Sequence, residues 1–387
     1  MGTPYLNSRL QDFTSTIFAE MSALAVQTGA VNLGQGFPDT DGPMEILEAA
    51  VAAIRDGRNQ YPPGPGIPEL RAAIAEHQHR FYGLTFDPDT EVLVTTGATE
   101  AIAAALLALC ETDDEVVSFQ PYYDSYAAGI AMAGAHRRLI TLRPPDYRFD
   151  PHELRAAITD RTRLLLLNTP HNPTGKVFSA AELAVIAELA IERDLIVVTD
   201  EVYEHMTYDG VPHSPIAGLP GMRERTVTIS SAGKTFSVTG WKIGWVCAPP
   251  ELLAAVRTAK QFLTFVSGAP FQPAVAVGLR LPDAFYADLA TSLQGKRDRL
   301  CAGLTAAGFE VYRPAGTYFV TTDVRPLGYD DSVSFCRDLP RRCGVVAVPN
   351  VVFYDDKQAG ASLVRFAFCK RDGVLDEAVT RLAGLSP

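Results

Sequence analysis

The sequence has no excess of basic residues, and this absence argues against nucleic-acid binding. Its 34 Lys and Arg are outnumbered by 45 Asp and Glu, which gives a formal net charge of −11. Binding to a phosphate backbone needs a basic surface, but charges of both signs are scattered along the chain without a basic block. We therefore expect no nucleic-acid partner.

Long hydrophobic runs are also missing. A membrane-spanning helix requires roughly 20 consecutive apolar residues, and the best candidate, residues 101–110, is far shorter. The opening MGTPYLNSRLQDF has neither the basic nor the apolar part of a signal peptide. We expect no membrane partner and a cytoplasmic protein.

Paired cysteines are the third absence. The six cysteines are dispersed and form no C-x-x-C pair; they are Cys110, Cys247, Cys301, Cys336, Cys343 and Cys369. Isolated cysteines in apolar surroundings are typical of buried thiols in a reducing compartment. The sequence therefore predicts no metal site.

What the sequence does have is the composition of a packed globular protein. Apolar residues make up 47% and charged residues 20%, which excludes disorder, and 387 residues suggest two domains. Between residues 91 and 248, apolar strand-like runs alternate with segments of helical period; the runs are EVLVTT, EVVSF, TRLLLLN, LIVVTDE, TVTISS and WKIGWVCA. Such continuous apolar strands predict an α/β fold, with a mostly parallel sheet between layers of helices.

After about residue 276 the pattern changes. A long helical stretch leads to short strands and a closing helix; the strands are FEVY, TYFVTTD, VVAVP and SLVRFAFC. This order predicts a smaller α+β domain at residues 276–387, after a large domain at residues 46–275. The N-terminal segment, residues 1–45, is expected to pack on the small domain.

Residues at the carboxyl ends of parallel strands are the candidates for a ligand site. Gly97 ends one strand, and Ala98 and Thr99 open a helix whose free N–H groups suit an anion. The segment TISSAGKT differs from a nucleotide-binding P-loop only by having Thr228 where glycine is required. The following FSVTGWK does not have the helical pattern of a P-loop, which argues against that alternative.

Three charged residues have chemical reasons to belong to a site. Lys234 follows small residues at a strand end, a position that suits Schiff-base chemistry. Asp200 closes an apolar strand, so its carboxylate needs a cationic or N–H partner. Arg365 interrupts the apolar SLVRFAFC and needs an anion, which is either a ligand carboxylate or an internal salt bridge.

Taken together, five motifs resemble the pyridoxal-phosphate-dependent class I/II aminotransferases of fold type I. They are NLGQGFPD, NTPHNPTG, TDEVYEHM, SSAGKTFSVTGWKIGW and LVRFAFCKRD, and the resemblance extends over essentially the whole chain. It is strongest to the branch of kynurenine, glutamine and methionine aminotransferases, close to the actinobacterial N-succinyldiaminopimelate aminotransferases. The resemblance implies a seven-stranded type of central sheet.

The resemblance also implies a role for each catalytic residue. Lys234 would bond covalently to pyridoxal 5'-phosphate, and Asp200 would pair with the pyridine nitrogen so that the ring stays an electron sink. Asn172 and Tyr203 would hydrogen-bond the phenolic oxygen of the ring.

Further cofactor contacts follow from the same resemblance. Tyr123 would stack on the ring. The phosphate would lie among Gly97, Ala98, Thr99, Ser231 and Lys242. Tyr61 would reach the phosphate of a neighbouring subunit, which implies a homodimer with shared active sites.

On the substrate side, Arg365 would hold the α-carboxylate, helped by Asn172 and by the backbone at Gly36. Four aromatic residues are expected to line the pocket: Phe18, Tyr61, Tyr123 and Phe265. Such a pocket favours a kynurenine-, glutamine- or methionine-type donor, which passes its amino group to a 2-oxo acid by a ping-pong mechanism. Two alternatives stay open. One is N-succinyldiaminopimelate of lysine biosynthesis, whose tail carboxylate needs a cation; the other is cysteine-conjugate β-lyase activity on the same fold.

Overall fold

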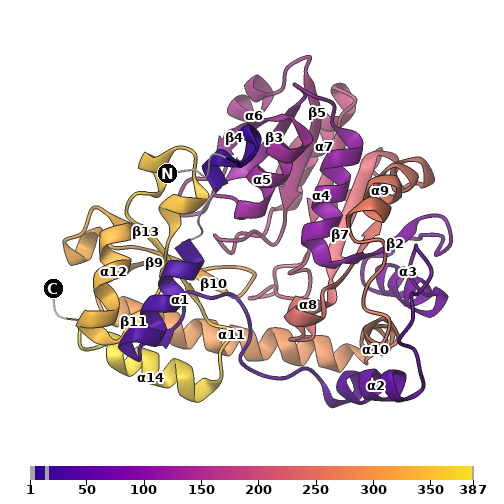
Figure 1. The fold of residues 1–387 in the computed structure, drawn as a ribbon. Coiled ribbons are helices and arrows are strands. Elements are labelled where there is room, and N and C mark those ends of the chain that lie inside the picture. Colours follow the sequence, from indigo (N-terminus) through magenta and orange to yellow (C-terminus); the bar gives the residue numbers. More distant parts are fainter. Residues whose placement is uncertain (1–4, 14–16, 386–387) are drawn as a thin grey trace.

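The computed structural model describes residues 5–13 and 17–385 and is built around a seven-stranded sheet (Figure 1). From edge to edge its strands are β2 (Val92–Thr96), β8 (Ile243–Cys247), β7 (Thr226–Ser231), β6 (Ile196–Asp200), β5 (Thr162–Asn168), β3 (Glu115–Gln120) and β4 (His136–Thr141). β8 runs antiparallel to β2 and β7, and the other neighbours are parallel. The predicted α/β fold with a mostly parallel sheet is confirmed.

The strands of this sheet are apolar on both faces because helices cover both. In β5, Leu164 and Leu166 point to one face, whereas Leu165 and Leu167 point to the other. The first face is covered by α4 (Gly97–Leu109), α5 (Asp124–Ala133) and α9 (Pro250–Leu263). The second is covered by α6 (Pro151–Ala157) and α7 (Ala180–Glu192) and, beside β2 and β8, by α2 (Met44–Arg55), α3 (Pro68–Tyr82) and α10 (Phe271–Leu279).

Strand β4 is the part of this sheet that the hydrophobic runs do not predict. It begins with His136, Arg137 and Arg138, and it pairs only with β3 at the edge of the sheet. An edge strand has one side open to water and tolerates charged residues. Arg138 also gives a buried carboxylate its ion-pair partner, because its Nη2 donates to Oε1 of Glu115 at 2.7 Å.

A second, antiparallel sheet is formed by the C-terminal third of the chain. Its strands, in order, are β12 (Val348–Pro349), β13 (Leu363–Ala367), β10 (Phe319–Asp323) and β9 (Glu310–Tyr312). The surrounding helices are the long α11 (Asp283–Ala306), α12 (Ser332–Cys343), α13 (Lys357–Gly360) and α14 (Asp372–Leu382). In Figure 1 this sheet lies beside the seven-stranded one, and α11 runs beneath both.

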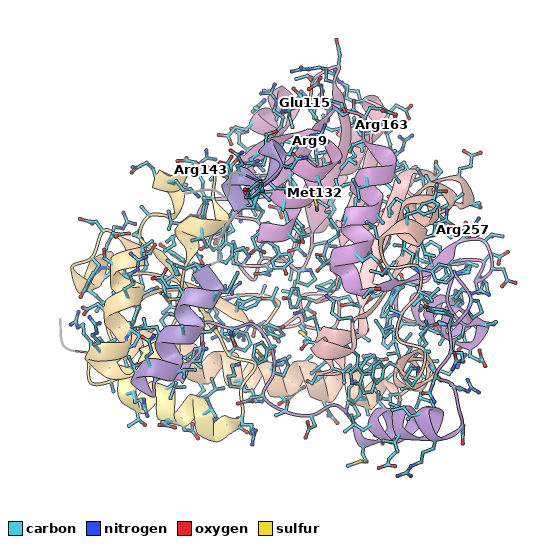
Figure 2. The ribbon with its side chains drawn as sticks, in the orientation of Figure 1. Arg9, Glu115, Met132, Arg143, Arg163 and Arg257 are labelled. Carbon is cyan, nitrogen blue, oxygen red and sulfur yellow. The ribbon has the colours of Figure 1, made fainter. Side chains whose placement is uncertain are left out.

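The N-terminal elements contact both parts of the molecule. The short 3₁₀ helix η1 (Ser8–Phe13) lies against α5, where Nη1 of Arg9 donates to the carbonyl oxygen of Met132 at 3.4 Å (Figure 2). Helix α1 (Ile17–Thr28) packs on α12, and β1 (Val31–Asn32) pairs in parallel with β11 (Val345–Val346). The domain boundaries at residues 45 and 275 stay a prediction.

The remaining elements are single turns. They are the helix α8 (Ala232–Thr235) and the 3₁₀ turns η2 (Ile216–Gly218), η3 (Arg223–Arg225), η4 (Thr239–Trp241), η5 (Arg325–Leu327) and η6 (Asn350–Phe353). In the described ranges, none of the helices combines the length and the apolar character needed to cross a bilayer. All six cysteines carry free thiols.

Candidate active site

A cavity of about 380 Å³ lies at the carboxyl ends of the central strands, and residues of both sheets line it. The structure brings together there all of the predicted site residues except Tyr61 and Phe265: Phe18, Gly36, Gly97, Ala98, Thr99, Tyr123, Asn172, Asp200, Tyr203, Ser231, Lys234, Lys242 and Arg365. Strands β6 and β7 and the start of α4 supply one wall, and β13 and α1 supply another.

Lys234 lies in α8, directly after β7. This helix has only four residues, so the structure contradicts the P-loop alternative, which needs a full helix after the lysine. The ammonium nitrogen lies 6.0 Å from the ring centre of Tyr203 and 5.9 Å from that of Tyr318. Burial lowers the pKa of Lys234, which favours the neutral, nucleophilic amine.

Asp200 ends β6 and is buried, with 4% of its surface exposed. Its Oδ2 accepts a hydrogen bond of 2.6 Å from the hydroxyl of Tyr126, and its Oδ1 accepts one of 3.3 Å from the N–H of Val202. Burial raises the pKa of Asp200 to about 6, and the two hydrogen bonds act in the opposite direction. The carboxylate thus has hydrogen-bond donors but also faces the cavity, where a cationic N–H would complete its partners.

Tyr126 is a site residue that the sequence analysis missed. It stands one helical turn after Tyr123 in α5, and the two rings meet edge to face at 5.7 Å. Tyr123 is the N-cap of α5, and the three-residue spacing in PYYDSY brings Tyr126 to the same side. This spacing could have indicated Tyr126 from the sequence.

Asn168 was missed as well, and it fixes the turn that carries Asn172. Its Oδ1 accepts from the N–H of Asn172 at 2.8 Å, and its Nδ2 donates to the carbonyl oxygen of Asp200 at 2.8 Å. One side chain therefore ties the ends of β5 and β6 together and sets the distance between the two site residues.

An anion site lies where β8 approaches the start of α4. A Cβ on Gly244 would lie 2.6 Å from the backbone carbon of Gly97, so only glycine permits this approach. Lys242 has a left-handed backbone (φ 55°), and its Nζ would lie 3.2 Å from a Cβ on Gly97, which itself has φ +72°. The N–H groups of Ala98 and Thr99 lack partners within α4, as in the first turn of any helix. Together they form an electropositive slot that fits a phosphate.

Arg365 lies in the middle of β13 and is 2% exposed. Its Nη1 donates to Oδ1 of Asn172 at 2.9 Å and its Nη2 to the carbonyl oxygen of Gly34 at 3.2 Å, while its Nε has no partner. Among residues 5–13 and 17–385 no carboxylate lies within ion-pair distance of this guanidinium, so the internal salt bridge that was the alternative is absent. Burial lowers the pKa of Arg365 to about 10, as expected for a buried cation that lacks an anion.

Aromatic rings enclose this arginine. The guanidinium carbon lies 4.0 Å from the ring centre of Phe319, 5.0 Å from Phe353 and 5.4 Å from Phe18. A Cβ at Gly36 would lie 2.4 Å from the ring of Phe319, which explains the glycine. Sequence reasoning missed Phe319, because nothing local marks an apolar strand residue as facing a cavity. It also missed Phe353, which lies in η6 and packs on the guanidinium outside the cavity lining.

Tyr61 and Phe265 lie outside this cavity. Tyr61 is 82% exposed and Phe265 is 52% exposed, and their rings meet edge to face at 5.6 Å. Of the expected aromatic pocket, one chain therefore brings together Phe18 and Tyr123 only. The role expected for Tyr61 concerns a second chain and stays a prediction.

The residues of the cavity fit a flat cofactor with three functional groups. The slot at α4 suits a phosphate, the buried Asp200 suits a protonated ring nitrogen, and the unpaired amine of Lys234 suits a carbonyl carbon. Pyridoxal 5'-phosphate carries all three groups.

Comparison with known proteins gives the same assignment. The family model "Aminotransferase class I and II" matches residues 28–382. A Mycobacterium tuberculosis protein described as a probable N-succinyldiaminopimelate aminotransferase is 57% identical, over 98% of both chains. The methionine aminotransferase of Escherichia coli is 41% identical over 98% of both chains. The mouse kynurenine–oxoglutarate transaminase 3 is 38% identical over 96% of this chain and 88% of its own.

A solved structure agrees in fold as well. The N-succinyldiaminopimelate aminotransferase from Mycobacterium tuberculosis superposes with a TM-score of 0.96 at 57% identity, over 98% of this chain and 100% of the other.

Proposed function

The chain belongs to the class I and II aminotransferases, whose cofactor is pyridoxal 5'-phosphate, and we propose that its amino donor is N-succinyldiaminopimelate. The observation that carries this proposal is the identity to the mycobacterial relative, which clearly exceeds the identity to the methionine and kynurenine enzymes. The kynurenine-, glutamine- or methionine-type donor favoured by the sequence analysis is therefore the less supported alternative.

A methionine-type donor stays the second candidate because of the cations in the cavity. In the described part of the chain, the lysines and arginines that line it are Lys234, Lys242 and Arg365. Each of them already has a role, in covalent attachment, phosphate binding and α-carboxylate binding respectively. No further cation lines the cavity of one chain for the succinyl carboxylate, whereas the rings of Phe18, Tyr123 and Phe319 suit an uncharged side chain.

The mechanism divides the work among the residues described above. When bound, pyridoxal 5'-phosphate supplies an electron sink for the electron pair left at the substrate's α-carbon. The guanidinium of Arg365 binds the α-carboxylate and so fixes the position of the α-carbon. The amine of Lys234, whose neutral form burial favours by lowering its pKa, takes the α-proton on Nζ, and this proton does not go back to the same carbon, because the α-carbon ends as the carbonyl carbon of the 2-oxo product. Asp200, held by the hydroxyl of Tyr126, would pair its carboxylate with the protonated ring nitrogen of the cofactor.

The enzyme is proposed to be a homodimer in which Tyr61 completes the phosphate site of the partner. Four large apolar residues support this, because they are exposed on one chain: Tyr61, Phe262, Leu263 and Phe265. Their exposure would be unusual on an isolated monomer. Light scattering should give twice the chain mass of 41.8 kDa, and Tyr61→Phe should weaken cofactor binding without changing that mass. The cytoplasmic location also stays a proposal.

A half-reaction screen tests the substrate. Single amino donors are added to purified holoenzyme, the absorbance change of the bound cofactor is followed, and the 2-oxo product is measured. We expect the highest rate with N-succinyl-LL-diaminopimelate. A faster reaction with methionine, glutamine or kynurenine would overturn the proposed donor but not the aminotransferase. Release of ammonia and pyruvate from a cysteine conjugate would reveal β-lyase activity.

A further inference from the structure

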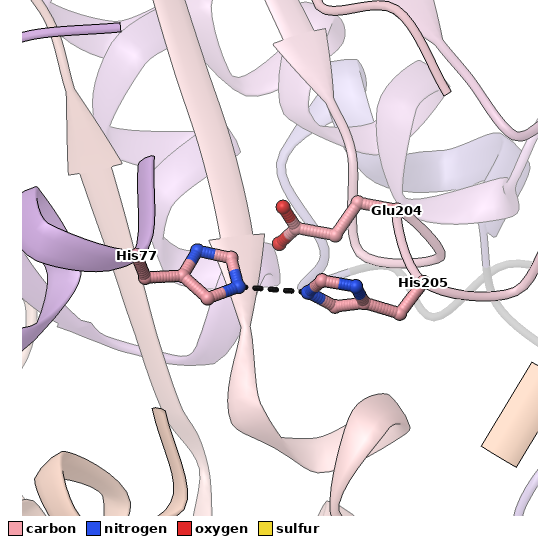
Figure 3. Close-up of side chains that lie close together, drawn as sticks. All are labelled: His77, Glu204 and His205. Carbon is pink, nitrogen blue, oxygen red and sulfur yellow. Dashed lines mark hydrogen bonds between the residues drawn. The ribbon is translucent and has the colours of Figure 1, made fainter. Parts of the chain in front are cut away.

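Three potential metal ligands meet behind the cofactor cavity, in a layer that the proposed reaction does not use. His77 lies on α3, and Glu204 and His205 lie on the turn that follows β6 (Figure 3). The Nε2 atoms of the two histidines are 2.7 Å apart, and one ligand atom from each of the three residues lies within 4.8 Å of the others. Figure 3 shows the carboxylate of Glu204 beside both rings.

Buried polar atoms without hydrogen bonds gather around these residues. They are Nδ1 of His77 and Nδ1 of His213, and the hydroxyl of Tyr82 faces the carboxylate of Glu204. His77 is only 2% exposed and Glu204 only 4%. Since buried polar groups in native proteins are almost always paired, an ion between these side chains would give them a partner.

We propose that His77, Glu204 and His205 bind a divalent transition-metal ion, for which zinc is the best match. Two imidazole nitrogens and one carboxylate oxygen are a ligand set that zinc uses, with the fourth position left for a water or for the nearby Tyr82. The other carboxylate oxygen of Glu204 accepts from the hydroxyl of Ser230, an interaction of the kind that orients metal ligands.

The geometry requires only a small adjustment. Zinc–nitrogen bonds of about 2.0–2.1 Å place two tetrahedral ligands about 3.3 Å apart, so the rings would separate by roughly 0.6 Å from their hydrogen-bonded distance. The proton that the two Nε2 atoms share would move to an Nδ1, and Nδ1 of His77 has no other partner. His205 is partly exposed and gives an ion access from its side.

The charges around the cluster are compatible with a cation. Arg80, whose charge acts on His77, is paired with Asp283, which accepts from its Nε at 2.8 Å. On the far side, Glu201 accepts from His213 at 2.9 Å, so a second carboxylate lies in the same layer. A bound ion would be attracted by both Glu204 and Glu201.

The metal would tie α3 to the turn that carries the cofactor residues. Glu204 directly follows Tyr203, and its N–H donates to the carbonyl oxygen of Glu201 at 2.9 Å within that turn. The sequence predicted no metal because its cysteines are dispersed. The proposed ligands contain no cysteine, and His77 is 128 residues away from His205.

The test uses tag-free holoenzyme, because a histidine tag binds zinc. After treatment with a chelator, the protein is incubated with zinc, passed through a desalting column and analysed for metal. We expect about one zinc per chain and a rise in Tm of about 3 °C at free zinc of roughly 100 times Kd. His205→Asn and His77→Asn should each lose the retained zinc and the rise in Tm.

The control is His79→Asn, which removes an exposed histidine two residues from His77 on the same helix. This variant should bind zinc like the wild type. Cobalt gives a second readout, because a visible d–d band should form in the wild type and in His79→Asn but not in His205→Asn. If His77→Asn fails to fold, His205→Asn at the edge of the cluster decides. The proposal is wrong if the wild type retains no zinc, or if His205→Asn retains as much zinc as the wild type.

Discussion

Removal of the Arg365 guanidinium should abolish recognition of the substrate's α-carboxylate and leave the cofactor in place. The arginine is 2% exposed, lies under aromatic rings, and has an Nε without a partner. A bidentate carboxylate would therefore gain two charge-assisted hydrogen bonds in a site shielded from water. At about 1.5–3 kcal/mol each, their loss corresponds to about 3–6 kcal/mol. This is a decrease in kcat/KM of about 10² to 10⁴.

The assay compares the best donor from the half-reaction screen with its α-amide, which has no carboxylate charge. Wild type should prefer the acid by the factor worked out above, and Arg365→Met should lose most of this preference. Cofactor absorbance should be the same in both proteins. Arg257→Ala, which removes an exposed arginine on α9 (Figure 2), is the control and should behave as wild type.

Stability provides an independent check of the same reasoning. A buried guanidinium without an anion destabilises the fold, and burial accordingly lowers its pKa to about 10. Arg365→Met should therefore match or exceed the Tm of wild type when no substrate is present. A Met variant with an unchanged preference for the acid, or one that loses cofactor and substrate recognition together, would refute the role assigned to Arg365.

Three further predictions follow from the buried groups. Lys234→Ala should remove the covalent attachment of the cofactor, so that after borohydride reduction the denatured variant carries no cofactor whereas the denatured wild type does, and it should lower turnover by at least about 10³. Tyr126→Phe deletes the 2.6 Å hydrogen bond to Asp200 and should raise the pKa of that carboxyl further, lowering kcat by about tenfold while the mass in solution stays that of the wild type. His171 is buried and its pKa is lowered to about 3, so the unfolded chain binds its proton first and stability falls as the pH drops from 6.5 towards 3. In urea unfolding between pH 7 and 5.5, His171→Asn should lose about 1 kcal/mol less stability than wild type, and equal losses would contradict this assignment.

The fold was predictable where one kind of residue dominates a segment. Runs such as TRLLLLN are apolar on both faces, so strand and burial follow from the sequence directly. The sequence analysis missed strand β4, because an edge strand does not have to be apolar on both faces or fully buried. The C-terminal strands were expected close to their observed positions, although VVAVP divides between two sheets as β11 and β12, a division that local sequence does not encode.

The candidate site was predictable for charged residues whose burial costs free energy unless a partner is present. A lysine, an aspartate and an arginine at or within buried strands need partners, and these residues line the cavity. The missed residues are those whose presence in a helix or at a strand end can be explained by the fold alone. Tyr126 and Asn168 fit a helix and a strand end without any ligand, and only their hydrogen bonds to Asp200 reveal a further task.

The pairing of β1 with β11 has a consequence for how the protein is made. Val31 in β1 pairs with Val345 in β11, so β1 cannot form its backbone hydrogen bonds until roughly 300 further residues have been synthesised. At about 5–20 residues per second, this delay is roughly 15–60 s. Strand β6 with Asp200 and helix α8 with Lys234 are synthesised more than 100 residues before Val345. On the ribosome, the cofactor half of the pocket is therefore complete before the substrate half, and Met21, Ala25 and Leu33 leave the tunnel without the core that later buries them. During this interval the nascent chain exposes apolar surface of the kind that chaperones bind.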